Sequence, residues 1–131
     1  MSEHCFLSEE KLQYLTMTYH PALLSAVKDF NSGRYFEAHE HLEEALDDVE
    51  DDDNTWELFV GLIQIAVGYH KYVSGYPGGV KMLGKGLRKV SPLPEECAGV
   101  RLESLRRRVR QDLENERNIL ASPPRVQLIR P

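Results

Sequence analysis

Cysteine and positive charge are both scarce in this sequence. Its two cysteines, Cys5 and Cys97, match no metal-ligand spacing, and an intracellular protein would keep both as thiols. The 131 residues include 16 Lys and Arg against 21 Asp and Glu, which gives a formal net charge of -5. That balance disfavours a protein whose main task is to grip phosphate backbones. We therefore expect no nucleic-acid partner.

Targeting signals and an uninterrupted membrane span are also missing. Residues 1–15 are acidic and polar, which fits neither a secretory signal nor an Arg-rich transit peptide. The longest apolar stretch, residues 55–74, is nearly long enough to cross a bilayer, but it is interrupted by Glu57, Gln64, His70 and Lys71. We expect a cytoplasmic protein without a membrane partner.

Residues 55–74 organise the predicted fold, because their apolar side chains occupy every side of a helix. Those side chains are Trp56, Leu58, Phe59, Val60, Leu62, Ile63, Ile65, Ala66, Val67, Tyr69, Tyr72 and Val73. A helix of this kind belongs in the middle of a fold, where other segments remove it from water. The chain is also long enough for one domain with one core.

Four further helices are predicted around it, each with a single apolar stripe. They cover residues 21–30, 34–49, 80–90 and 98–120. Ser32-Gly33 and Ser74-Gly75 each end one helix and open another, which indicates helical hairpins. We predict an all-α fold: a compact bundle of five to six helices, arranged as hairpins around residues 55–74.

The remaining segments have weaker patterns. Residues 1–20 are predicted to be a weakly ordered N-terminal segment, 21–121 a single all-helical domain and 122–131 a C-terminal tail. The tail has no hydrophobic period, so its removal is expected to change stability by less than about 0.5 kcal/mol. The triplet Arg106 to Arg108 has carboxylates on both sides in the sequence, at Glu103, Asp112, Glu114 and Glu116, and we expect a solvated, salt-bridged face rather than an anion site.

The residues that could carry chemistry lie within the predicted helix 34–49. His39 and Glu43 are four residues apart, so they share one face and could hold a common metal ion. His39-Glu40-x-x-Glu43 has the form of the zinc-protease motif HExxH with its second histidine replaced. His39 and Glu43 would then be ligands and Glu40 the general base. Alternatively, His39 and Glu43 form a buried hydrogen-bonded pair that orients two helices.

Two polar residues interrupt the central helix. Gln64 shares a stripe with Gly61 and Gly68, and each glycine costs about 1 kcal/mol relative to alanine within a helix. A close approach by another backbone or by a ligand would explain them, with Gln64 in the resulting notch. His70 lies near the helix C-terminus and is interpreted as a satisfied core residue or a ligand.

Two motifs resemble a known family. The motif F-N-x-G-x-Y-F-E-A-H-E-x-L-E at residues 30–43, followed by G-L-I-Q-I-A at 61–66 and Y-H at 69–70, is similar to the domain-of-unknown-function family three-zero-nine. The resemblance implies a compact all-α domain, and some members are labelled predicted metal-dependent hydrolases. By position, it implies that the polar site residues are Glu37, His39, Glu40, Glu43, Gln64 and His70. The sequence departs from the family at Leu46, where tryptophan is usual, and at Val80, where alanine is usual.

Two functions are consistent with these residues. The first is a binding or scaffold domain whose partner is a small molecule or a protein, with a homo-oligomer also open. The second is a small metal-dependent hydrolase, in which His39 and Glu43 bind zinc, manganese or iron and Glu40 is the base. A hydrolase needs at least three convergent ligands and an open position for water.

Overall fold

The computed structural model describes residues 19–129, so the prediction for the N-terminal segment lies almost entirely outside the described part. Its helices are α2 (Pro21–Asn31), α3 (Tyr35–Glu44), the 3-10 turn η2 (Leu46–Val49), α4 (Asp53–Val73), α5 (Gly79–Val90), α6 (Glu103–Glu114) and α7 (Arg117–Ala121). Its short strands are β1 (Glu96–Cys97), β2 (Val100–Arg101) and β3 (Gln127–Leu128).

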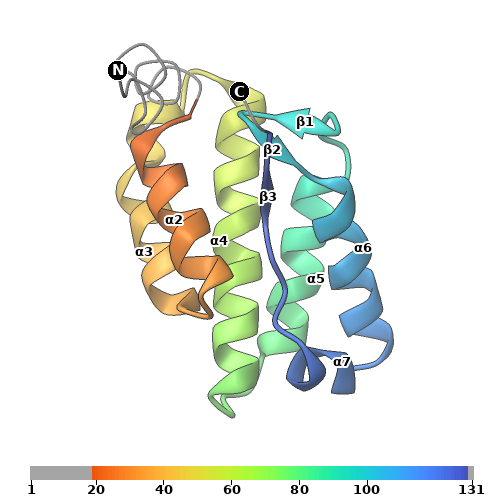
Figure 1. Ribbon diagram of the computed structural model, residues 1–131. Helices are drawn as coiled ribbons and strands as arrows, with labels where there is room; N and C mark the ends of the chain where they lie inside the picture. Colours follow the sequence, from red (N-terminus) through yellow and green to blue (C-terminus); the bar gives the residue numbers. More distant parts are fainter. Residues whose placement is uncertain (1–18, 130–131) are drawn as a thin grey trace, which may run out of the picture.

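Helix α4 lies at the centre, with the hairpin α2–α3 on one side and α5 and α6 on the other (Figure 1). Its core side chains are at most 4% exposed, and they are Leu58, Phe59, Leu62, Ile65, Ala66 and Tyr69. Gly33 and Gly75 end the preceding helices with positive φ angles of 81° and 76°, as the hairpin turns require. The predicted all-α bundle around a central helix is confirmed.

The end of α3 differs from the prediction of one helix over 34–49. The α-helix ends at Glu44, and a 3-10 turn follows, in which the amides of Ala45 and Asp48 donate to the carbonyls of Leu42 and Ala45 at 3.2 and 3.0 Å. Acidic side chains at a helix C-terminus interact unfavourably with the helix macrodipole, which disfavours continuing the α-helix here. The i→i+3 hydrogen bonds of the 3-10 turn still satisfy the last carbonyl groups. Asp52 caps α4 by accepting a hydrogen bond from the amide of Thr55.

The predicted last helix, residues 98–120, is wrong at both ends. Ala98 and Gly99 have φ angles of 51° and 89°, so they form a two-residue turn of the kind that joins β1 to β2. The helix α6 starts only at Glu103, and it stops where Asn115 takes an extended conformation. Ala98 had matched the helical period by coincidence.

The two long helices α4 and α5 approach each other through glycines. A Cβ atom on Gly61 would lie 3.3 Å from the carbonyl oxygen of Gly86, and one on Gly86 would lie 2.8 Å from that of Gly61. Gly68 and Gly79 form a second such pair, with corresponding distances of 2.9 and 2.8 Å. The predicted close approach of another backbone to Gly61 and Gly68 is confirmed.

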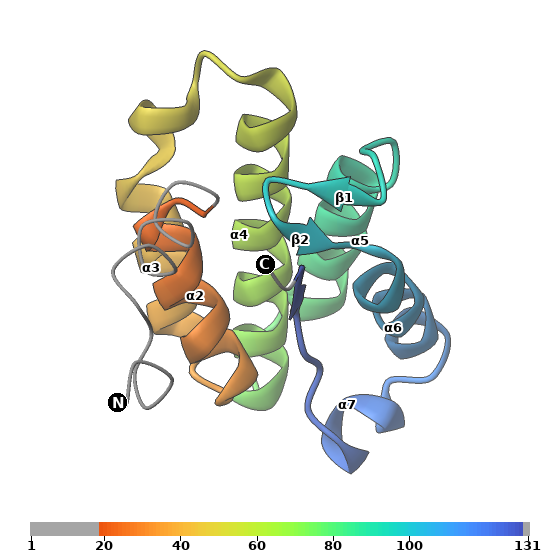
Figure 2. The same ribbon diagram turned by 45° about the horizontal axis from the view of Figure 1, so that its top comes forward.

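The C-terminal segment is laid over the domain. Strand β3 pairs antiparallel with β2, and Figure 2 shows this segment running along the bundle between α2 and α6. Val126 is only 5% exposed. Its amide donates to the side chain of Asn31 at 2.7 Å, and its carbonyl accepts from the same carboxamide at 3.0 Å.

Removal of residues 122–131 is therefore expected to destabilise the protein by about 2 kcal/mol. It exposes the apolar surface that packs against Val126, and it leaves the side chain of Asn31 without its hydrogen-bond partner. This prediction from the structure replaces the change of less than about 0.5 kcal/mol that was expected from the sequence. Thermal unfolding of the truncated and full-length proteins measures the loss, which should lower Tm by several degrees.

Two point variants identify the cause of this loss. Val126→Ala should account for part of it, whereas Gln127→Ala should be neutral because Gln127 is exposed. A truncated protein that melts within about one degree of the full-length chain would show that this segment contributes no net stability.

Candidate functional site

The first four predicted site residues lie on α3. Glu40 and Glu43 are exposed, and Glu37 and His39 are partly buried. The Nδ1–H of His39 donates to the carbonyl oxygen of Phe36 at 2.5 Å, which leaves Nε2 as the unprotonated nitrogen of the neutral ring. The alternative of a buried His39–Glu43 pair is wrong, because Glu43 is exposed.

These residues do not form the donor set of a catalytic zinc. Among residues 19–129 no group of three or more His, Cys, Asp or Glu side chains is placed to hold a metal ion. His39 and Glu43 thus lack a third ligand from the described part of the chain, and a catalytic zinc requires three. The hydrolase stays a prediction from sequence without support from this geometry.

His70 belongs to an aromatic cluster that joins α3 to the end of α4. Its ring centroid lies 5.2 Å from that of Phe36 and 6.2 Å from that of Tyr76. Phe36 also contacts His39 edge to face, with centroids 4.8 Å apart. The structure therefore brings His39 and His70 together around Phe36, 31 positions apart in the sequence.

The same place collects the exposed hydrophobic side chains. Within residues 19–129 the large hydrophobic residues on the surface are Phe36, Val73 and Tyr76, which are 46%, 47% and 61% exposed. Val73 lies one turn after His70 on α4 and so on the same side of that helix. We call Phe36, His39, His70, Val73 and Tyr76 the aromatic–histidine face.

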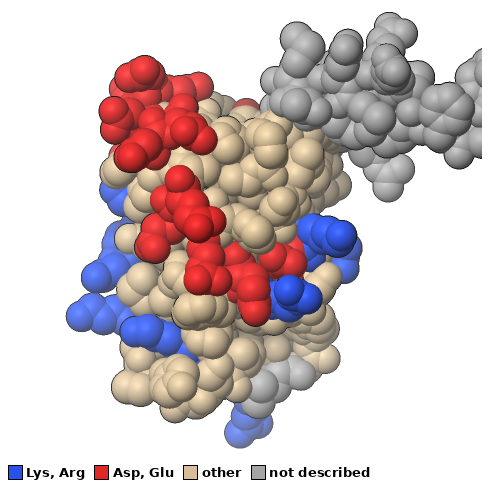
Figure 3. Space-filling view, turned by 90° about the vertical axis from the view of Figure 1, so that its left-hand side faces the viewer, with Lys and Arg blue, Asp and Glu red and all other residues tan. Residues whose placement is uncertain are grey.

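Acidic side chains extend along α3 from this face toward the opposite end of the bundle. Residues 35–70 contain eleven Asp and Glu and no Lys or Arg. Figure 3 shows them gathered at the upper end of the α3 side of the molecule and continuing as a band across it. Glu37 follows Phe36 directly and Glu40 lies one turn after it on α3, whereas seven of the eleven carboxylates lie between residues 47 and 57, after α3 and in the first turns of α4.

Gln64 lies elsewhere. It is between Gly61 and Gly68 on the side of α4 that packs on α5, whereas His70 contacts Phe36 of α3. Its Oε1 atom is buried and has no hydrogen-bond partner among the described residues. A buried acceptor without a hydrogen bond lowers the stability of a protein by about 1–3 kcal/mol. The structure therefore does not bring Gln64 to the histidines.

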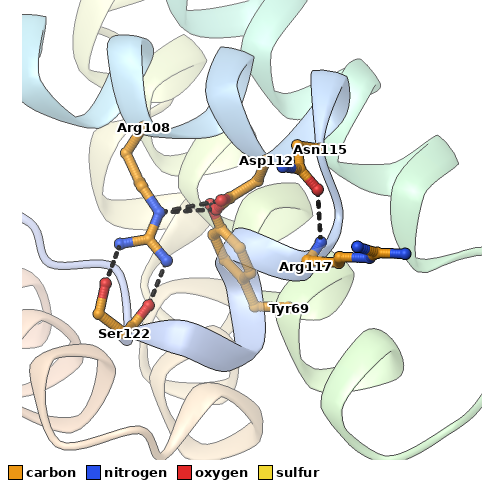
Figure 4. A network of polar contacts seen from close by, with 6 residues as sticks. All are labelled: Tyr69, Arg108, Asp112, Asn115, Arg117 and Ser122. Atoms are coloured by element: carbon orange, nitrogen blue, oxygen red, sulfur yellow. Dashed lines mark hydrogen bonds and ion pairs between the residues drawn. The ribbon is translucent and has the colours of Figure 1, made fainter.

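A buried polar network was missed from the sequence (Figure 4). Asp112 is fully buried and accepts a 2.6 Å hydrogen bond from the hydroxyl of Tyr69. Its two oxygens also accept from Nε of Arg108 at 3.0 and 2.9 Å. Arg108 then donates to the hydroxyl and carbonyl oxygens of Ser122. The network ties α4 and α6 to the C-terminal segment.

The surroundings of Tyr69 suit a permanently neutral hydroxyl. Burial raises its pKa well above the ordinary value of a tyrosine, and the hydrogen bond to Asp112 and that carboxylate's charge raise it further. The hydroxyl therefore stays protonated and donates to Asp112, and the network is a structural tie.

The expectation of a solvated face on α6 is wrong for two of its charged residues. Arg106 is 8% exposed and donates to the carbonyl oxygens of Val90, the last residue of α5, and of Leu93 in the loop that follows. Asp112 follows Leu105 by seven residues and Val109 by three, so it shares their buried stripe. This spacing could have predicted the burial of Asp112 from the sequence. It was overlooked because Asp112 is charged.

The fold and this face define a small all-helical domain with one exposed aromatic–histidine surface. Residues 23–83 match the model of the family described as "Domain of unknown function (DUF309)", which confirms the resemblance over most of α2, all of α3 and α4, and the start of α5. No match was found among curated proteins. No helix between residues 19 and 129 is long and apolar enough to cross a membrane.

Proposed function

We propose that this chain is a binding domain that recognises a protein segment on its aromatic–histidine face. One observation carries the proposal: Phe36 and Tyr76 both lie against the ring of His70, and Val73 follows His70 by one turn, so the exposed large hydrophobic residues of the described chain cluster around one histidine. Scattered exposed hydrophobic residues need no explanation, but a cluster of them is typical of an interaction site. Aromatic side chains are also the usual anchors of such sites.

The charge beside this face indicates the partner's chemistry. A segment with apolar anchors flanked by Lys or Arg would place its hydrophobic side chains on Phe36 and Tyr76 and its cations along the acidic band. Complementary charge of this kind speeds association and selects the partner. A second copy of the same chain fits less well, because a twofold interface would bring two acidic bands together.

Peptide binding to the full chain tests this proposal. We expect an amphipathic peptide of Leu, Trp and Lys to bind more tightly than the same peptide with Glu in place of Lys, as measured by fluorescence anisotropy at two salt concentrations. Phe36→Ser and Tyr76→Ser should each weaken the Lys peptide at least about tenfold. Glu40→Lys should slow its association and reduce the salt dependence.

Lys85→Ser is the matched control, because Lys85 is exposed on α5 away from this face. It should leave the affinity for both peptides unchanged. Equal affinity for the Lys and Glu peptides, or full binding by the Phe36→Ser variant, would contradict the proposal. The cytoplasmic location inferred from the sequence stays a prediction.

A further inference from the structure

A groove of about 690 Å³ opens between α2, the start of α6 and β3. Its lining consists of Val27, Asn31, Arg101, Ser104, Arg125, Val126, Gln127 and Leu128. Two of these residues are arginines and none is a carboxylate. None belongs to the aromatic–histidine face, so the groove is a separate feature of the molecule.

The strand register directs the two arginines to the same side. Arg101 of β2 lies directly opposite Gln127 of β3, and directly opposed residues share one face of a sheet. Arg125 precedes Gln127 by two positions, which returns its side chain to that face. The exposure agrees, since Arg125 and Gln127 are exposed and Val126 between them is buried.

These cations are weakly compensated. A terminal nitrogen of Arg101 lies 3.7 Å from the carboxylate of Glu96, in a pair whose side chains are 46% and 55% exposed. Arg125 has no ion pair or hydrogen bond with any residue from 19 to 129. Exposed ion pairs such as Arg101–Glu96 contribute little to stability. Both guanidinium groups therefore have donors left for a ligand.

Two further elements of the wall favour an anion with an apolar body. Ser104 lies in the first turn of α6, where amides lack intrahelical partners and the dipole favours negative charge. The carboxamide of Asn31 is already bonded to Val126 on both sides, so it supports the wall. Val27, Val126 and Leu128 supply the apolar surface.

We propose that this groove binds a phosphate monoester carried on a small apolar group. Two guanidinium groups match the geometry and charge of phosphate oxygens, which they bind by paired, charge-assisted hydrogen bonds. The apolar part would lie against Val27, Val126 and Leu128. The volume is within the range of about 300–1,000 Å³ that small-molecule sites occupy.

Phenyl phosphate is the probe, titrated into the isotope-labelled full chain and followed by amide NMR shifts. We expect saturable shifts at residues 101–105 and 125–128, with tighter binding than inorganic phosphate or phenol. Arg101→Gln and Arg125→Gln should each raise Kd at least about tenfold. Arg110→Gln is the control, because Arg110 is exposed on α6 outside the groove.

An equal loss in Arg110→Gln and Arg125→Gln would overturn the proposal, because it would show only a general charge effect. Inorganic phosphate that binds as tightly as phenyl phosphate would also overturn it, because the apolar wall would then have no role. Phosphatidylcholine vesicles containing phosphatidic acid test a lipid as the source of the same group. If the protein sediments with these vesicles and Arg125→Gln abolishes the sedimentation, the phosphate site is supported with a lipid as its ligand. If the protein binds phenyl phosphate but does not sediment with the vesicles, the site is supported with a free ligand.

Discussion

Asp112→Ala should destabilise the protein by about 3–5 kcal/mol, the largest effect we expect from a single substitution. The carboxylate of Asp112 is fully buried and is bonded to both Arg108 and Tyr69. Its removal leaves the Arg108 guanidinium, whose side chain is only 18% exposed, without its anion and leaves the Tyr69 hydroxyl without an acceptor. Denaturant unfolding with an unchanged slope would measure the loss directly.

Glu114→Ala provides the comparison, because it removes an exposed carboxylate from the same helix and should change stability by less than about 0.5 kcal/mol. Tyr69→Phe should cost about 1–3 kcal/mol, since it deprives Asp112 of one donor. The double variant should lose less than the sum of the two single losses, because both act on one network. A loss below about 1 kcal/mol in Asp112→Ala would mean that water replaces the carboxylate.

Gly86→Ala is expected to cost about 3 kcal/mol, at the upper end of the range for overpacked cores. The added Cβ atom would lie 2.5 Å from Cγ1 of Ile65, 2.8 Å from the carbonyl oxygen of Gly61 and 2.9 Å from the amide nitrogen of Ile65. Two of these three atoms belong to the backbone of α4, so the helices must move apart. Denaturant midpoints quantify the loss.

Gly84→Ala, two residues away on α5, should have the opposite sign. Only the flexible end of Arg88 lies near its added Cβ atom, at 3.7 Å. The substitution should therefore raise stability by about 0.5–1 kcal/mol through helix propensity alone. If Gly86→Ala also stabilised the protein, the close contact between α4 and α5 would not exist in solution.

Local pattern was sufficient to predict most of the helices. The all-round apolar character of residues 55–74 placed α4 at the centre, and the spacing of Gly61 and Gly68 indicated the close helix pair. Both depend on neighbours three to seven residues apart, which the helical period brings onto one face. The partial resemblance of His39-Glu40-x-x-Glu43 to a metal motif depends on the same period, but it specifies two ligands and not a third.

The sequence by itself thus determined the helical bundle, its hairpins and the residues that line its core, because these follow from propensity and period. Only the tertiary structure decided which polar residues meet. Tyr69 and Asp112 are 43 residues apart, and Asn31 and Val126 are 95 apart. No local period encodes such pairs, since they depend on how the helices and the C-terminal strand dock. The gathering of Phe36, His70 and Tyr76 and the separation of Gln64 from them have the same cause, because α3 and α5 cover different sides of α4.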